Sequence, residues 1–284
     1  MNPIQWFPGH MAKTMKELKK ELNQVDLIIE CIDARSPKSC EHKFFDTLAE
    51  KKERVIVLTK TDLANASITA SWKKYYKKMN IEAFDVNILN KNGLKPLLNH
   101  LKRYSDQKRE KKQFFITKVM IIGLPNIGKS ALINALAKKQ ATKVQNKPAI
   151  TKQTQWVTIT DHLFLLDTPG VLMPKIKSDE TAIKLSLIKC IKDTLFDYTK
   201  VTRWFIQHLS NHHQTLIEKR YDITIDMLNP DEIITLIAQK RQCILQNGEI
   251  NDEKVVRLII EDFRTGRLGR ISFDSPSLNH HDAL

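Results

Sequence analysis

The sequence of 284 residues has few cysteines and no long hydrophobic run. Its four cysteines, Cys31, Cys40, Cys190 and Cys243, include no CxxC pair, so neither a zinc site nor a disulfide framework is predicted. No segment approaches the roughly 18 consecutive apolar residues of a membrane-spanning helix, and the N-terminus has no apolar signal core. These absences predict a soluble, unexported protein in a reducing cytoplasm.

Acidic residues are also in short supply. The chain has 46 lysines and arginines against 32 aspartates and glutamates, a formal net charge of +14. Such a balance favours a polyanionic partner such as nucleic acid, although a basic soluble protein without such a partner is the simpler alternative. The hydrophobic content of 42% is enough to build proper cores, and the length predicts two domains.

Short β-rich runs alternate with polar helical stretches over the first part of the chain. The runs cover residues 26–32, 54–58, 82–86, 118–123, 156–160 and 163–167, and the helical stretches include 66–80 and 93–104. This alternation predicts an α/β domain with parallel βαβ units. Residues 102–112 have almost no apolar content, so they form either a charged linker or an exposed helix end.

The last part of the chain has a different character. Beyond about residue 178 the β-rich runs give way to helical periodicity. Asn229 and Pro230 are typical of the start of a helix, and a further helix over 252–265 ends at Gly266. We therefore predict two domains, residues 1–178 and an all-α domain over 179–284.

The N-terminus carries an unusual stretch, "WFPGHM". Exposed aromatics on a free tail are unfavourable, so Trp6 and Phe7 are expected to dock and thereby hold His10 after a Pro-Gly turn. An amphipathic helix follows, with Met11, Met15, Leu18 and Leu22 at helical spacing and a basic stripe formed by Lys13, Lys16 and Lys20.

The stretch "GLPNIGKS", Gly123 to Ser130, matches the phosphate-loop pattern GxxxxGK[ST] between a β-rich run and a helical stretch. Its glycines let backbone N–H groups surround phosphates at a helix N-terminus, while Lys129 reaches the β- and γ-phosphates and Ser130 binds Mg²⁺. The predicted nucleotide contacts of this loop are Asn126, Ile127, Gly128, Lys129, Ser130 and Ala131.

Downstream, "DTPG" follows another β-rich run. In this position Asp167 is expected to reach Mg²⁺ through water, and the Gly170 amide to sense the γ-phosphate. Between the two motifs, Thr151 could bring its hydroxyl to Mg²⁺, or it could be an ordinary loop threonine.

The stretch "LTKTD" points to guanine as the base. The Asp62 carboxylate can accept the N1–H and 2-amino donors of guanine, whereas adenine offers no matching pair. Lys60 would pack its stem along the base, with Thr59 and Thr61 completing the motif. The loop over 86–93 could supply backbone N–H groups from Asn87 and Ile88 to the guanine oxygen.

The order of these motifs is unusual. Ras-like GTPases begin with the phosphate loop, but here the guanine motifs precede it. Cutting a Ras-like sheet between its third and fourth strands and joining the old ends through a linker near 102–116 gives the observed order. With "WFPGHM", "DARSP" (33–37) and "FRTGRLGRIS" (263–272), the chain resembles the ribosome biogenesis GTPase A family (RbgA, also called YlqF) over essentially its whole length.

Two departures qualify this resemblance. Thr59 stands where the family usually has asparagine, which should weaken one hydrogen bond, and the 86–93 loop lacks the common Ser-Ala pair, so Asn87 and Ile88 are assigned by position.

The resemblance implies a mechanism and a partner. Val171 occupies the position of the water-orienting glutamine of Ras-type enzymes, so the family resemblance assigns that role to His10. Asn126 resembles the asparagine with which related GTPases use K⁺. The partner implied is the large ribosomal subunit precursor, bound by a monomer in the GTP state and left after hydrolysis.

Candidate RNA contacts lie at both ends of the chain. Arg264, Arg267 and Arg270, together with Lys13, Lys16 and Lys20, either contact phosphates or form solvated faces. Two other functions fit the motifs: a non-hydrolysing, GTP-gated RNA-binding scaffold, and a GTPase switch that acts on another RNA or on a protein.

Overall fold

The structure is a computed structural model that describes residues 8–50, 52–138, 154–172, 176 and 178–276; for residues 8–12 and 49 it describes the backbone alone. The chain divides into two compact units. The first comprises residues up to Ile176 together with those from Ser272 on, and the second comprises Lys177–Ile271.

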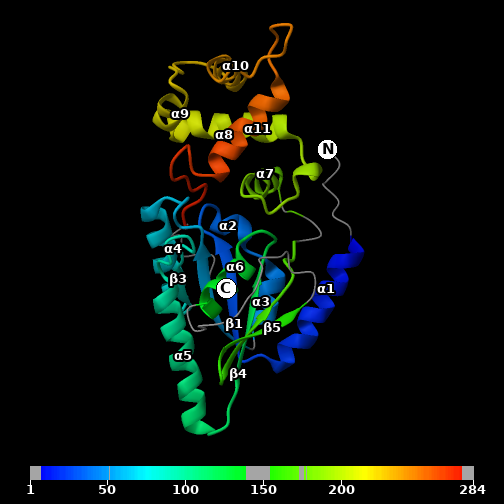
Figure 1. Cartoon of the computed structure of the whole chain (residues 1–284), viewed down its shortest axis with the longest axis vertical. Coiled ribbons are helices and arrows are strands. Elements are labelled where there is room, and N and C mark those ends of the chain that lie inside the picture. The colour runs from blue at the N-terminus through cyan, green and yellow to red at the C-terminus, as the bar shows by residue number, and fades with distance from the viewer. Residues whose placement is uncertain (1–7, 51, 139–153, 173–175, 177, 277–284) are drawn as a thin grey trace. The chain divides into compact units, whose positions relative to one another are not determined.

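The first unit is built on a six-stranded sheet of order β3-β2-β1-β4-β6-β5, in which only β5 runs antiparallel to its neighbour (Figure 1). The strands are β1 (Leu27–Asp33), β2 (Glu53–Thr59), β3 (Glu82–Asp85), β4 (Thr117–Gly123), β5 (Gln155–Thr160) and β6 (Leu163–Asp167). All six predicted runs are strands, and the predicted α/β class is confirmed.

The centre of the sheet is formed by strands that are distant in sequence. β1 pairs in parallel with β4, with Leu27 opposite Val119, and every residue of β1 is buried. Continuous burial is typical of a parallel strand covered on both faces. β4, the strand before the phosphate loop, therefore lies in the middle of the sheet, although it is the fourth strand along the chain.

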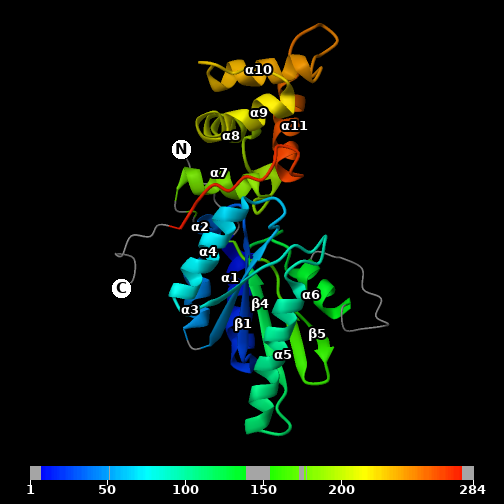
Figure 2. The same cartoon turned by 90° about the vertical axis from the view of Figure 1, so that its left-hand side faces the viewer.

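Helices cover both faces of this sheet. They are α1 (Pro8–Glu21), α2 (Pro37–Cys40), α3 (Lys43–Ala49), α4 (Ala66–Lys78), α5 (Leu94–Lys111) and α6 (Lys129–Lys138). α5 and α6 lie on one face, with α3 and α4 on the other (Figure 2). α1 packs beside α3, where Lys19 Nζ lies 5.9 Å from the Phe44 ring centroid.

Two sequence expectations need correction here. The charged stretch 102–112 is not a linker but the end of α5, which continues to Lys111, so only residues 112–116 connect it to β4. The predicted Pro-Gly turn is instead helical, because α1 begins at Pro8. Proline is favoured in the first turn of a helix, where its missing N–H costs nothing.

The second unit is all helical, as predicted. Its elements are α7 (Asp179–Leu187), the short 3-10 helix η2 (Asp193–Leu195), α8 (Tyr198–His212), α9 (Gln214–Tyr221), α10 (Pro230–Lys240) and α11 (Asp252–Arg264). Asn229 caps α10 in a capping box with Glu232, and Gly266, at φ 76°, follows the end of α11. Both boundaries agree with the sequence prediction.

The C-terminal boundary differs from the predicted one. Ser272 to Asp274 belong to the first unit and bond to its residues: Phe273 N donates to the Arg35 carbonyl at 2.8 Å, and Trp72 Nε1 donates to the Asp274 carbonyl at 3.0 Å. Periodicity could not place this segment, because its position depends on contacts with residues more than 200 positions away. No helix in the described part of the chain is long and apolar enough to cross a membrane.

Candidate nucleotide site

The phosphate loop follows β4 and leads into α6. Gly123 has φ +148°, and a Cβ built there would lie 2.6 Å from the Cys31 carbonyl oxygen, so a larger residue does not fit. Gly128 has φ +102° and Asn126 adopts φ +57°, both in the left-handed region. This backbone brings the loop back to the N-terminus of α6, where helix N–H groups and the helix dipole favour an anion.

Lys129 is held inside this loop. Its ammonium donates to the carbonyl oxygens of Gly123 at 3.2 Å and Leu124 at 2.9 Å, and the side chain is buried. A buried lysine is rare unless it is paired. The structure therefore places a positive charge at the centre of the loop, where the sequence predicted it.

The DTPG segment lies directly against the phosphate loop. Asp167 ends β6 and pairs in register with Ile121 of β4. A Cβ built on Gly170 would lie 2.5 Å from Pro125 Cα, and Val171 N donates to the Gly123 carbonyl at 3.3 Å. Two motifs about 40 residues apart in sequence thus share one edge of the sheet, as the prediction required.

The residues of this edge fit a magnesium ion. Mg²⁺ prefers oxygen ligands, and the Ser130 hydroxyl and Asp167 carboxylate are of that kind. Asp167 is 8% exposed, and a buried carboxylate needs compensating positive charge. Lys129 and a divalent ion are suited to supply it.

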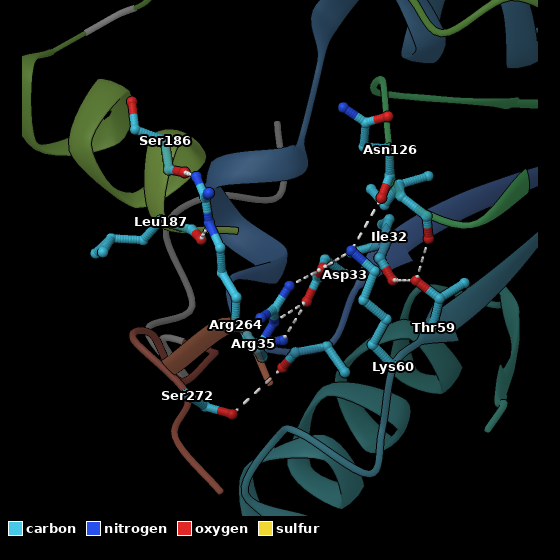
Figure 3. A network of polar contacts seen from close by, with 12 residues as sticks. Ile32, Asp33, Arg35, Thr59, Lys60, Asn126, Ser186, Leu187, Arg264 and Ser272 are labelled. Atoms are coloured by element: carbon cyan, nitrogen blue, oxygen red, sulfur yellow. Dashed lines mark hydrogen bonds and ion pairs between the residues drawn. The ribbon is translucent and has the colours of Figure 1, made fainter. Parts of the chain in front are cut away.

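The TKTD motif reaches the same loop from β2. Thr59 is fully buried, and its hydroxyl donates to the Ile127 carbonyl at 2.7 Å. Lys60 Nζ donates to the Asn126 carbonyl at 2.9 Å (Figure 3). Although threonine replaces the family's asparagine at 59, its side chain still links this strand to the phosphate loop.

Asp62 follows Lys60 and Thr61 in a half-exposed turn. No described residue donates a hydrogen bond to its carboxylate, so both oxygens remain acceptors for a ligand. This arrangement suits the recognition of paired N–H donors.

The 86–93 loop also approaches the phosphate loop, because a Cβ built on Gly128 would lie 3.9 Å from Ile88 Cδ1. Asn87 and Ile88, the two residues assigned to the guanine oxygen, nevertheless differ in whether their N–H group already has a partner among the described residues. The Asn87 N–H, predicted to contact the guanine oxygen, donates to the Asn92 carbonyl at 3.1 Å, and the Asn87 side chain accepts from Leu89 N at 2.8 Å. Asn87 therefore shapes the loop, and only Ile88 remains as its candidate base contact.

Sequence reasoning missed one part of this site. Asp33, at the end of β1, accepts from Arg35 Nε at 2.9 Å and from Lys60 Nζ at 2.9 Å (Figure 3). Burial alone would raise the pKa of Asp33, but the charges of Arg35 and Lys60 outweigh it and hold the pKa below its usual range. Asp33 and Arg35 belong to the "DARSP" stretch. In the sequence this stretch supported only the resemblance to the family and had no assigned chemical role.

Two predicted residues cannot be located with their side chains. His10 lies in the first turn of α1, but its side chain, like Trp6 and Phe7, is outside what the structure describes. Thr151 also lies outside the described residues.

Arg264 is not a free surface arginine, which corrects one expectation about RNA contacts. Its side chain is 8% exposed. The guanidinium donates to the carbonyls of Ser186 at 2.8 Å and Leu187 at 3.1 Å and pairs with Asp193 at 2.7 Å. Arg264 thus satisfies the last carbonyls of α7 instead of pointing outward. Arg267 and Arg270 remain exposed, as do Lys13, Lys16 and Lys20.

Each nucleotide motif follows its own parallel strand and reaches the same edge of the sheet, while the guanine motif comes before the phosphate loop in sequence. Fold and site together define a circularly permuted GTPase. The family model described as 50S ribosome-binding GTPase matches residues 118–245, and the RsgA GTPase model matches residues 20–177, which is more than half of the chain.

Whole-chain relatives narrow this class. The ribosome biogenesis GTPase A of Bacillus licheniformis is 36% identical over 96% of this chain and 98% of its own. That of Bacillus pumilus is 33% identical over 96% and 99%. The chain therefore belongs to the ribosome biogenesis GTPase A family.

Solved structures agree. The GDP-bound structure of YlqF superposes with a TM-score of 0.67 at 25% identity, covering 92% of this chain and 99% of that one. The GNP-bound YlqF from Thermotoga maritima gives a TM-score of 0.65 at 25% identity, covering 93% and 99%.

Proposed function

We propose that this protein hydrolyses GTP to GDP and phosphate during assembly of the large ribosomal subunit, binding subunit precursors with GTP and leaving them after hydrolysis, in the cytoplasm. The proposal rests on one observation: three segments, the TKTD motif, the DTPG motif and the 86–93 loop, all contact the phosphate loop after β4. The names of the relatives and the 50S ribosome-binding family model support the large subunit as partner.

The phosphates are held by charge and backbone. In the proposed complex the N–H groups of residues 126–131 surround the β-phosphate, Lys129 neutralises the β- and γ-phosphates, and the Gly170 amide contacts the γ-phosphate. The close contact of Gly170 with Pro125 supports this role, since it places the DTPG segment directly against the phosphate loop. That segment leads into the second unit along the chain.

Ser130, Asp167 and Thr151 would hold Mg²⁺, Asp167 through water. When bound, the ion neutralises charge that develops on the phosphates. Asn126, next to the Lys60 contact, is the proposed ligand for a supplementary K⁺.

Guanine is recognised by Asp62, with Thr61 beside it. The Lys60 stem lies along the base, and the Ile88 N–H donates to the guanine oxygen. Asn87 supports this loop from within.

Base recognition has a direct test. We expect Asp62→Asn to lower GTP affinity about 100-fold, because two hydrogen bonds to a charged acceptor are lost, and to gain affinity for xanthosine triphosphate, which offers an acceptor to the new amide. Titration with both nucleotides measures the change. Lys129→Ala serves as the comparison, since it should weaken binding of both nucleotides alike. Unchanged GTP affinity in Asp62→Asn would remove Asp62 from the base site.

The ribosomal part of the proposal is tested by co-sedimentation of the tagged protein with large-subunit precursors in GTP and in GDP. We expect association with GTP and release with GDP. Equal sedimentation in both nucleotides would contradict release on hydrolysis.

A further inference from the structure

Asp33 is buried at the end of the central strand β1, next to the nucleotide site but outside its motifs. It accepts hydrogen bonds from Arg35 N at 3.1 Å, Arg35 Nε at 2.9 Å and Arg35 Nη2 at 2.8 Å. The fourth contact is the ion pair with Lys60 Nζ at 2.9 Å. A fully buried carboxylate with this many donors is fixed in one position.

Lys60 is in turn fixed at its charged end. The ammonium contacts both Asp33 and the Asn126 carbonyl of the phosphate loop, each at 2.9 Å, and the side chain is 26% exposed. Its backbone adopts φ +55°, a conformation that non-glycine residues seldom take. Lysine loses much side-chain entropy when it is ordered. Here the protein orders Lys60 itself, so a ligand that packs on the lysine stem does not bear this cost.

The loop that carries Asp33 and Arg35 is held by the returning C-terminal segment. Ser272 Oγ donates to the Ala34 carbonyl, Phe273 N donates to the Arg35 carbonyl, and Asp274 accepts from Ser36 Oγ at 2.9 Å and from Lys38 N at 2.6 Å. Ser272 also accepts from Asn65 N at 3.1 Å, close to the TKTD motif. The segment 272–274 therefore bridges the loop after β1 and the turn after β2.

We propose that Asp33 is a positioning residue that presents Lys60 to the purine of a bound guanine nucleotide, and that segment 272–274 keeps the Asp33 loop in place. This rests on the proposed nucleotide site. It makes nucleotide affinity depend on residues that follow the helical unit along the chain, far in sequence from every nucleotide motif.

A double-mutant cycle tests the role of Asp33. GDP affinity of the full chain is measured by fluorescence titration for wild type, Asp33→Asn, Lys60→Met and the double variant. We expect Asp33→Asn to lower affinity about tenfold in wild type and to have no further effect in Lys60→Met, because coupled residues are non-additive. A loss by the same factor in both backgrounds would show a general structural role and overturn the proposal.

Two further variants sharpen the result. Glu30→Gln is the matched control, since Glu30 lies on the same strand, is also buried and also pairs with an arginine, Arg54, away from the motifs. It should alter thermal stability but not GDP affinity. Asp274→Ala should lower GDP affinity about threefold in wild type and not in Lys60→Met; it also keeps the test decisive if Asp33→Asn fails to fold. If the wild-type protein does not bind GDP, the proposed nucleotide site is refuted. If it binds GDP and the cycles are additive, the nucleotide site stands and only the positioning role of Asp33 is refuted.

Discussion

At the residue scale, position 171 shows what hydrolysis requires of the rest of the chain. Val171 is 1% exposed and donates its N–H to the phosphate loop at Gly123. An aliphatic side chain cannot accept a hydrogen bond from an attacking water, so another residue must orient it. His10 remains our proposal, because an imidazole can accept from water near neutral pH.

Replacing His10 should separate nucleotide binding from hydrolysis. We propose that large ribosomal subunits stimulate hydrolysis. We expect His10→Ala to leave GTP affinity nearly unchanged and to lower this stimulated turnover by about tenfold to a thousandfold, as expected when a positioned polar catalyst is lost. Phosphate release with and without large subunits measures this. Glu17→Ala, an exposed change in the same helix outside the basic stripe, is the control. Stimulated turnover equal to wild type in His10→Ala would favour a catalyst supplied by the ribosome.

At the scale of elements, the stability of the helical unit depends on hydrogen bonds to the carbonyl groups at the ends of its helices. The last carbonyls of a helix have no partner within it. In α7 they are bound by Arg264, which comes from the end of α11. One side chain therefore links residues of two helices that are 78 positions apart in sequence.

This role predicts a large loss of stability. We expect Arg264→Ala to reduce the free energy of unfolding of the helical unit by about 2–4 kcal/mol, since it removes the donor to the Leu187 carbonyl and the charged partner of Asp193. Chemical unfolding followed by circular dichroism measures it. Lys240→Ala, which breaks an exposed pair with Asp222, should change stability much less. Wild-type stability in Arg264→Ala, with loss of subunit binding, would restore Arg264 as an RNA contact.

The end of α8 carries a cluster of rings. The His208 ring stacks on Trp204 with ring centroids 5.2 Å apart, and the centroids of the His208 and His212 rings are 4.8 Å apart. Burial, followed by the nearby His212 and His213, lowers the pKa of His208 from 6.5 to about 4. His208 is therefore neutral in the folded protein at neutral pH.

The pH dependence follows from the sign of this shift. Between pH 6.5 and about 4 the unfolded chain protonates His208 while the folded one does not, so stability is lost as the pH falls through this range. We expect His208→Phe, which keeps the stack, to show a smaller drop in melting temperature between pH 7.5 and pH 5 than wild type. Lys184 and Glu180 also face His208, so His212→Ala is measured alongside to separate the contribution of the neighbours. An identical pH profile in His208→Phe and wild type would contradict the shift.

At the scale of the whole molecule, charge is the property that bears on the partner. A formal charge of +14 favours association with RNA, and such association weakens with salt because counterions are released from the phosphates. The exposed lysines of α1 and the exposed Arg267 and Arg270 contribute to this charge in both units.

Salt therefore gives a test of the whole protein. We expect affinity for large-subunit precursors to fall by about a hundredfold or more between 50 and 200 mM salt, as for partners that make several phosphate contacts. GDP affinity, measured under the same conditions, should change much less. Subunit binding that is insensitive to salt would show that proteins, not RNA, provide the main contacts.

The sequence by itself determined the strands, the order of the motifs and the class of site. Alternation of β-rich and helical stretches is a local property, and the contacts of Lys129 follow from a motif whose geometry is set within a few residues. The permutation was also readable, because each motif follows its own strand. The caps at Asn229 and Gly266 were predictable for the same local reason.

Only the tertiary structure decided which charged residues lie beside the nucleotide site and which hold the helical unit together. Arg264 and Arg270 look alike in sequence, but burial turns Arg264 into a cap for α7. Asp33 was overlooked because its partner Lys60 is 27 residues away, and the place of Ser272–Asp274 depends on residues more than 200 positions earlier. The energy of a buried charge depends on what surrounds it in space, and no local pattern contains that information.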